Sequence, residues 1–209
     1  MKIKFISIIL GLFSSFFVHA QSVNPPFSEE ETRRIEQQAK DYIKSFTRAV
    51  PKLATTHDDE LQRTITANIK SLFIPNAKVE VMNVDSQKHI YPLSSYLLNV
   101  VGDYSDRFGV VVLKFENIVV NHNSFKPILN SEGVITGYKG SYSFVQIFCV
   151  TDKNVKKEGK YEMEDFIVCE KTRKKGDLIL KKVTSPTAGD HWVLLLGNIK
   201  ANQIENLKK

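Results

Sequence analysis

The hydrophobic pattern of this chain changes near residue 107, from helical spacing before it to strand-like runs after it. Apolar residues recur every three or four positions over 28–51, 58–73 and 92–104, which predicts three amphipathic helices. Residues 77–84 alternate and predict a short strand, and the Val-, Ile- and Phe-rich second half predicts a meander of about four or five more. Helices gathered before an antiparallel meander are typical of the α+β class, with the helices on one face of the sheet.

Local signals set the expected ends of these elements. Ser28 and Glu31 form the S-x-x-E pattern of a capping box, and Pro51 is expected to end the first helix. Thr56 or Asp58 could cap the second helix. In the second half we expect strands at 108–120, 135–150, 161–172, 178–183 and 191–199, with a loop at 121–133 and a tight turn or bulge at 174–177.

The N-terminus has the organisation of a secretory signal peptide. Lys2 and Lys4 precede the apolar stretch 5–18, and the small residue Ala20 stands at the expected cleavage position. A membrane anchor is the alternative, but the apolar run is shorter than the roughly 20 residues of a spanning helix. No cysteine lies near the cut, so a lipoprotein is not expected. The sequence therefore predicts export to the periplasm or the extracellular space, after cleavage behind Ala20.

The predicted organisation is a signal peptide (1–20), a linker (21–27), one domain (28–201) and a polar tail (202–209). Loss of Lys2 and Lys4 with the signal peptide lowers the formal net charge from +6 to +4. Such a small positive charge on an exported chain does not favour nucleic acid as a partner. No other segment is apolar enough to predict a membrane span in the mature chain.

Five segments follow one another in the predicted order of elements: LFIPNAKVEVMNV (72–84), YPLSSYLLNVV (91–101), YKGSYSFVQIF (138–148), YEMEDFIVCEK (161–171) and HWVLLLGNI (191–199). Their order resembles the nuclear transport factor two-like superfamily, whose domains form a cystatin-like α+β cone. The resemblance covers about 27–201 and includes secreted bacterial members of unassigned function. It implies three helices packed in the concave face of a strongly curved, mostly antiparallel sheet of about five to six strands, with a pocket between them. Members include isomerases, dehydratases and binding proteins, so the fold alone does not choose a function.

Candidate pocket residues are aromatic or polar side chains on these segments. An isomerase or dehydratase would need a carboxylate base in an apolar pocket, and Asp165 is a candidate with Tyr42 or Tyr96 as its partner. A solvent-facing Asp165 is the simpler interpretation, because aspartate is usually exposed. Gln146 could be a polar anchor for a ligand or a residue of the sheet surface. The expected binding residues are Tyr42, Tyr96, Phe115, Tyr142, Phe144, Gln146, Asp165 and Trp192.

Neither a metal nor a cofactor is predicted. The histidines show no H-x-x-x-H spacing and do not cluster with cysteine. No glycine-rich phosphate loop or nucleophile motif is present.

The two cysteines, Cys149 and Cys169, fall on neighbouring strands of a hairpin expected to be centred near Gly159. Direct opposition would allow a disulfide, which an oxidising compartment would favour. A register slip of one residue would instead leave two buried thiols. Both possibilities stay open at the level of the sequence.

The last strand is apolar on both faces, with Trp192, Leu194 and Leu196 on one and Val193, Leu195 and Ile199 on the other. It is therefore expected to be central or covered on both sides, and its second face could form a homodimer through the sheet. We predict an exported, non-catalytic protein that binds a small apolar molecule or a protein segment in the cone pocket. The alternatives are a cofactor-free isomerase or dehydratase with an Asp/Tyr pair, and a structural module that dimerises through its sheet.

Overall fold

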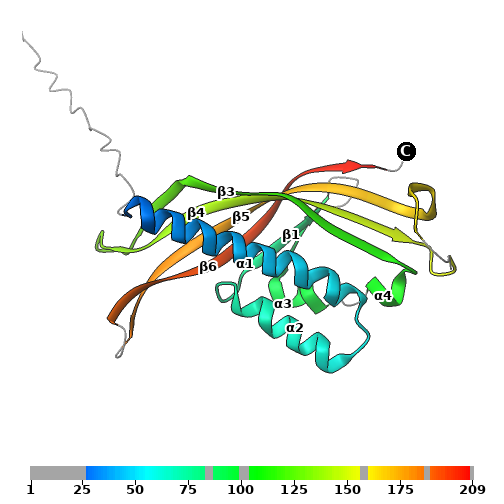
Figure 1. The fold of residues 1–209 in the computed structure, drawn as a ribbon, viewed down its shortest axis with the longest axis horizontal. Helices are drawn as coiled ribbons and strands as arrows, with labels where there is room; N and C mark the ends of the chain where they lie inside the picture. The colour runs from blue at the N-terminus through cyan, green and yellow to red at the C-terminus, as the bar shows by residue number, and fades with distance from the viewer. Residues whose placement is uncertain (1–26, 83–86, 99–103, 156–159, 186–188, 208–209) are drawn as a thin grey trace, which may run out of the picture.

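The computed structural model describes residues 27–82, 87–98, 104–155, 160–185 and 189–207, and the predicted signal peptide lies outside these ranges. In this part of the chain, helices come early and long strands follow (Figure 1). The elements are α1 (Glu29–Thr55), α2 (Asp59–Ser71), β1 (Lys78–Met82), β2 (Lys88–Pro92), α3 (Leu93–Ser95), α4 (Tyr104–Arg107), β3 (Val111–Leu129), β4 (Ile135–Thr151), the short 3₁₀ helix η2 (Met163–Asp165), β5 (Phe166–Ser185) and β6 (Gly189–Asn206).

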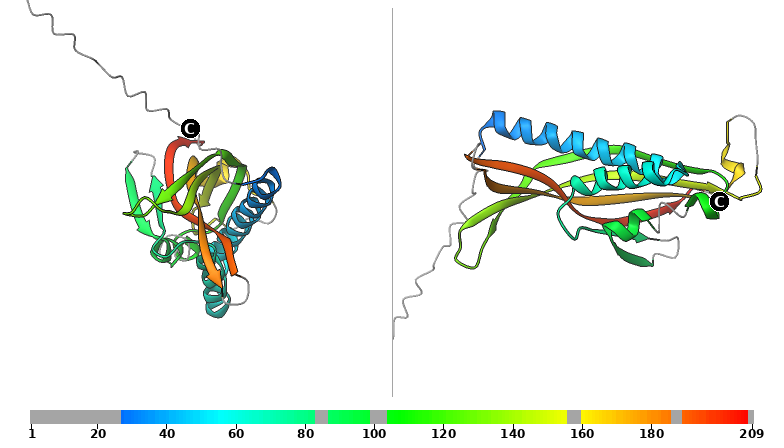
Figure 2. Two further views of the ribbon diagram at one scale, coloured as in Figure 1. Left: turned by 90° about the vertical axis from the view of Figure 1, so that its left-hand side faces the viewer. Right: turned by 90° about the horizontal axis from the view of Figure 1, so that it is seen from below.

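The strands form one six-stranded sheet in the order β2-β1-β6-β5-β4-β3. Neighbouring strands pair antiparallel except β1 and β6, which are parallel and meet at Val79 and Ile199. The sheet is curved, and α1 and α2 lie on one of its faces (Figure 2). The predicted α+β class with a mostly antiparallel sheet is confirmed. We call the side under the helices the inner face and the opposite side the outer face.

The first helix begins as predicted and ends later than predicted. Ser28 Oγ accepts a hydrogen bond from the Glu31 backbone N–H, and the Glu31 carboxylate accepts one from the Ser28 backbone N–H. The prediction that Pro51 ends the helix is wrong, because α1 continues to Thr55. A proline inside a helix costs about 3 kcal/mol. Burial of Leu53 and Ala54 in the turn that follows offsets this cost.

The region between α2 and α4 differs most from the sequence-based prediction. Asp58 caps α2 as one of the two expected residues, accepting a hydrogen bond from the Leu61 backbone N–H at 2.8 Å. Residues 88–92 form β2 against β1, a strand that the sequence did not predict. The single helix predicted over 92–104 is replaced by short α3, a π-helical turn at 96–98 and α4, while residues 99–103 lie outside the description.

The late strands are longer than their hydrophobic patterns suggest. β5 begins at Phe166 and joins the strands predicted at 161–172 and 178–183 into one. It has a bulge at 174–177, one of the two alternatives that the sequence predicts there. β3 extends to Leu129 and takes up most of the loop expected at 121–133. β6 continues to Asn206, past the domain end expected at 201. These strands extend because their neighbouring strands are also long. Pairing along the whole length satisfies backbone N–H and C=O groups that would otherwise lack a hydrogen-bond partner.

The core fills the inner face between α1 and the middle of the sheet. Phe46 from α1 contacts Phe73, Phe115 and Phe144, with ring centroids 5.3–6.5 Å apart. At the end of the sheet near the start of α1, Trp192 packs edge-on against Phe27. The buried side chains at the centre include Ile43, Val50, Leu97, Tyr142, Leu178, Leu180, Leu194, Leu196 and Ile199.

Tyr142 covers Gly176, which lies directly opposite it on β5. A Cβ atom at position 176 would overlap the tyrosine ring. We therefore expect Gly176→Ala to lower the free energy of unfolding by about 2 kcal/mol, as overpacking typically does. Urea denaturation measures this loss. In a Tyr142→Leu background the same substitution should cost much less, and an equal cost in both backgrounds would contradict the contact.

Candidate functional site

The inner face of β4 and β5 turns polar toward the end of the sheet near α4. Alternate residues of β5 place Glu170, Thr172 and Lys174 on this face, following the side-chain period of two along a strand. Gln146 on β4 lies opposite Thr172. Thr172 and Lys174 are buried, whereas Gln146 and Glu170 are half-buried. With Glu80, Tyr96 and Tyr104, these side chains form what we call the inner polar site.

Lys174 is a charged side chain at the centre of this site, and it is only 4% exposed. Its Nζ donates to the backbone oxygen of Glu80 at 3.3 Å and lies 5.8 Å from the centroid of the Tyr96 ring. Burial lowers the pKa of Lys174 from 10.5 to about 8, although the nearby Glu80 carboxylate acts in the opposite direction. The ammonium makes this one hydrogen bond to the described residues, and it could make three.

Strands β1 and β2 supply a second lysine to the edge of the site. Lys88 Nζ lies 2.8 Å from Glu80 Oε1, and it also donates to the backbone oxygen of Ala201 at 3.2 Å. Ala201 is the β6 residue opposite Lys174. The Glu80 carboxylate is therefore shared between an ion pair with Lys88 and a longer-range attraction to Lys174. The positive charges outnumber the negative one at this end of the site.

Two tyrosines from the α3–α4 region close the other side. Burial raises the pKa of Tyr96 above its ordinary value. Burial also raises the pKa of Tyr104, and the neighbouring Tyr96 and Glu170 raise it further. The centroids of the Tyr104 ring and of the Phe148 ring on β4 are 4.8 Å apart. Burial raises the pKa of Glu170 as well. At neutral pH both phenols therefore keep their protons and can donate hydrogen bonds.

The structure brings together only some of the residues expected to line a pocket. Tyr96 and Gln146 belong to the inner polar site. Phe115, Tyr142 and Phe144 lie on the same face but form part of the packed core. Tyr42 lies on α1, where Gln38 Nε2 donates to its hydroxyl at 3.2 Å. Trp192 lies at the opposite end of the sheet, against Phe27 and Tyr138.

Asp165 is not near this site. It belongs to η2 instead of the strand expected at this position, and its Oδ2 accepts a hydrogen bond from the Glu162 backbone N–H at 2.7 Å. Its neighbours Tyr161 and Met163 line a hollow on the outer face. The structure therefore does not bring Asp165 together with Tyr42 or Tyr96, and its carboxylate caps a turn.

Sequence reasoning missed Lys174, Thr172 and Glu170 as site residues. The pattern that could have indicated them is the placing of every second residue, Glu170, Thr172 and Lys174, on one face of β5. It is recognised only if this segment is predicted as one continuous strand. A turn at 174–177 hides it, because the side-chain period is lost there.

The outcome for the last strand is mixed. β6 is central, between β1 and β5, as expected. Leu194 and Leu196 are fully buried on the inner face, but Ile199 shares that face instead of the opposite one. A register shift between Gly176 and Leu178 changes the pairing of β5 with β6 at this point.

Cys149 and Cys169 lie directly opposite each other on β4 and β5 and are joined as a disulfide. Both side chains are buried on the outer face with Phe166. In the described part of the chain, no group of three or more His, Cys, Asp or Glu residues could hold a metal ion.

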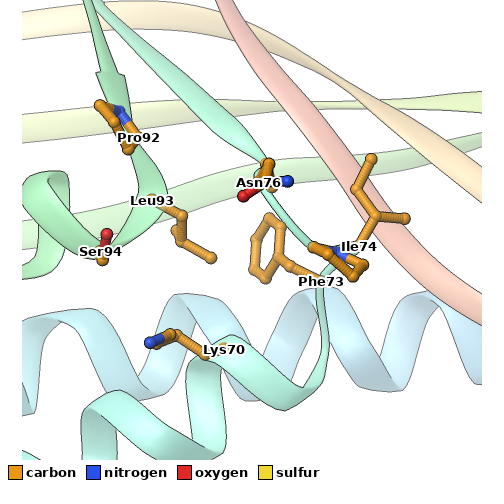
Figure 3. A pocket seen from close by; sticks show the side chains of 9 residues that line it. Lys70, Phe73, Ile74, Asn76, Pro92, Leu93 and Ser94 are labelled. Atoms are coloured by element: carbon orange, nitrogen blue, oxygen red, sulfur yellow. The ribbon is translucent and has the colours of Figure 1, made fainter.

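A smaller hollow of about 270 Å³ lies between the end of α2 and the start of α3 (Figure 3). Lys70 comes from α2, while Leu93 and Ser94 come from the opposite wall. Small-molecule sites typically measure about 300–1,000 Å³. This hollow lies below that range, and we therefore do not take it as the functional site.

A scan against protein-family models found no match, and a search of curated proteins found none either. Among solved structures, one similar chain is described as a candidate scytalone dehydratase from Novosphingobium aromaticivorans. The two share 9% sequence identity with a TM-score of 0.42, over 85% of this chain and 91% of the other. The fold assignment above depends on element order and sheet topology alone. No helix among the described residues is long and apolar enough to cross a membrane.

Proposed function

We propose that the protein binds a small molecule at the inner polar site without transforming it. The apolar body of the ligand would lie against the half-buried rings of Tyr104 and Phe148, which stand outside the packed core. The Lys174 ammonium would donate hydrogen bonds to an acceptor group at the other end of the ligand. Export behind Ala20, and membership of the nuclear transport factor two-like superfamily, remain parts of this proposal.

The buried ammonium of Lys174 is the observation that carries the proposal. Removing a charge from water is costly unless hydrogen bonds or an opposite charge compensate it. Here the Lys174 Nζ has one hydrogen bond to the described residues, and Glu80, the carboxylate that attracts it, is in an ion pair with Lys88. A buried ammonium with so little compensation lowers the stability of the fold. We therefore infer that Lys174 serves to bind a ligand and not to stabilise the structure.

A second candidate function is a cofactor-free isomerase or dehydratase. Glu170, and not Asp165, would then be the carboxylate base. Glu170 interacts electrostatically with Tyr104, and both have a raised pKa. A carboxylate base near a protonated phenol is the arrangement that proton transfer next to a carbonyl group requires. Binding remains the leading proposal, because Lys174 is more deeply buried than Glu170.

The test uses 1-anilinonaphthalene-8-sulfonate, which combines an aromatic body with an anionic acceptor. We expect a saturable rise in its fluorescence with the purified protein, and an affinity at least tenfold lower with Lys174→Met. Lys175→Met is the matched control, because this neighbouring lysine is exposed on the outer face. Equal affinity of the wild type and Lys174→Met would contradict the proposal.

A further inference from the structure

The largest of the described hollows lies on the outer face of the sheet and has a volume of about 580 Å³. We call it the outer groove. Strands β3 and β4, the segment leading into β5 and the C-terminal end of the chain supply its walls, and the disulfide lies at its floor. Its apolar lining consists mainly of Val112, Ile147, Tyr161, Met163, Phe166 and Leu207.

The groove has the size and lining of a ligand site. Its volume falls within the range of about 300–1,000 Å³ that is typical of small-molecule sites. Phe166 is buried at the base, whereas Met163 on η2 is 47% exposed. Leu207 is held against the groove by a hydrogen bond, because its backbone N–H donates to the Cys169 backbone oxygen at 2.8 Å. Apolar side chains that stay exposed to water in such a hollow favour binding of an apolar ligand, because the ligand removes them from water.

Three lysines lie in or beside the groove. Lys114 and Lys160 belong to its lining, and Lys171 lies beside it, because Lys114 and Lys171 are the two cross-strand neighbours of Ile147. None of the described residues forms an ion pair with any of these three lysines. Glu116 is the acidic residue of the lining, and Glu205 on β6 lies opposite Lys171. Lys114 and Lys160 are therefore the cations of the lining that can face a ligand.

We propose that the outer groove binds a free monoacyl carboxylate, that is, an amphiphile of the fatty-acid class. The acyl chain would lie over the disulfide and against Ile147, Met163 and Phe166. The carboxylate would lie near Lys114 and Lys160. An apolar hollow with lysines that form no ion pair with the described residues is complementary to an anionic amphiphile, and it disfavours a cationic one. The inference is independent of the function proposed for the inner polar site.

Calorimetric titration of the purified protein with hexadecanoate and dodecanoate below their critical micelle concentrations tests the proposal. We expect saturable binding of hexadecanoate, and a weaker affinity for dodecanoate by roughly fourfold per methylene removed from the groove. Hexadecyltrimethylammonium, which has the same chain and the opposite charge, should bind at least tenfold more weakly. Equal binding of the anionic and cationic amphiphiles would overturn the proposal.

Two variants locate the binding site. Lys114→Glu together with Lys160→Glu should reduce the affinity for hexadecanoate at least tenfold, and Met163→Glu should do the same through the apolar wall. All three positions are solvent-exposed, so these variants should keep the fold. Lys175→Glu on the same face is the control for net charge and should bind nearly as the wild type does.

Further outcomes separate this proposal from the others. Lys174→Met should leave hexadecanoate binding unchanged, and a loss there would assign the ligand to the inner polar site instead. A dimer that dissociates in Met163→Glu would mean that a second copy covers the groove, which overturns the proposal. Binding to anionic vesicles but not to free hexadecanoate would overturn it in favour of a membrane surface.

Discussion

Lys174→Met is expected to make the protein more stable by about 2 kcal/mol at pH 7 while weakening ligand binding. A fall of the Lys174 pKa from 10.5 to about 8 corresponds to a cost of about 3 kcal/mol for holding the charge at neutral pH. Methionine has a similar length and no charge, so this cost disappears. About 1 kcal/mol is lost again, because the Glu80 backbone oxygen no longer has this donor.

The pH dependence identifies the cause of this gain. The unfolded chain keeps the Lys174 proton up to a pKa of 10.5, whereas the native state releases it near pH 8. Between these values the unfolded state binds more protons, so the stability of the wild type rises with pH. The advantage of Lys174→Met should therefore shrink from pH 8 toward pH 10. Above pH 10 the raised pKa values of Tyr96 and Tyr104 act the other way and lower stability in both proteins.

Urea denaturation of the wild type, Lys174→Met and the control Lys175→Met at pH 7, 8, 9 and 10 measures these differences. The control replaces an exposed lysine and should change the free energy of unfolding by less than about 0.5 kcal/mol. A Lys174→Met variant that is less stable than the wild type, with no pH trend, would show that the ammonium is well compensated in the native state. In that case the main support for ligand binding at the inner polar site would be lost.

The sequence predicts the layers of this fold better than the lengths of its elements. Apolar periodicity identifies α1, α2 and the late strands, because burial of one face dominates the choice of residues there. It does not show that α1 continues through Pro51, since the deciding contacts of Leu53 and Ala54 are made to distant parts of the chain. It also misses β2, whose residues are mostly exposed and pair with only one neighbour.

The inner polar site could be predicted only in part, for a related reason. Tyr96 and Gln146 stand out as polar or aromatic residues among apolar ones, and both are found there. The sequence does not indicate Lys174 as a site residue, because it lies in a lysine-rich stretch that predicts a solvent-exposed turn. Its burial follows from the length of β5 and from pairing with both β4 and β6. Neither property is encoded in the local sequence around it.

The disulfide is a case where one structural fact decides between two alternatives that the sequence leaves open. Spacing places Cys149 and Cys169 on a hairpin but does not fix their register. In the structure the only shift between β4 and β5 falls after Val150, so the register is continuous from Gly137 to Val150 and Cys149 meets Cys169. The bond then joins β4 and β5 at the floor of the outer groove.

Loss of this bond is expected to lower the free energy of unfolding by about 3 kcal/mol. The cysteines are 20 residues apart, and closing a loop of this size in the unfolded chain accounts for about 3 kcal/mol in the chain-entropy model. The comparison is between the oxidised wild type and Cys149→Ala/Cys169→Ala in urea. Reduced wild type should resemble the double variant, and a reductant should have no effect on the variant itself. If the reductant leaves the wild type equally stable, the disulfide does not hold the hairpin, and the outer groove must be maintained by Phe166 and Leu207 alone.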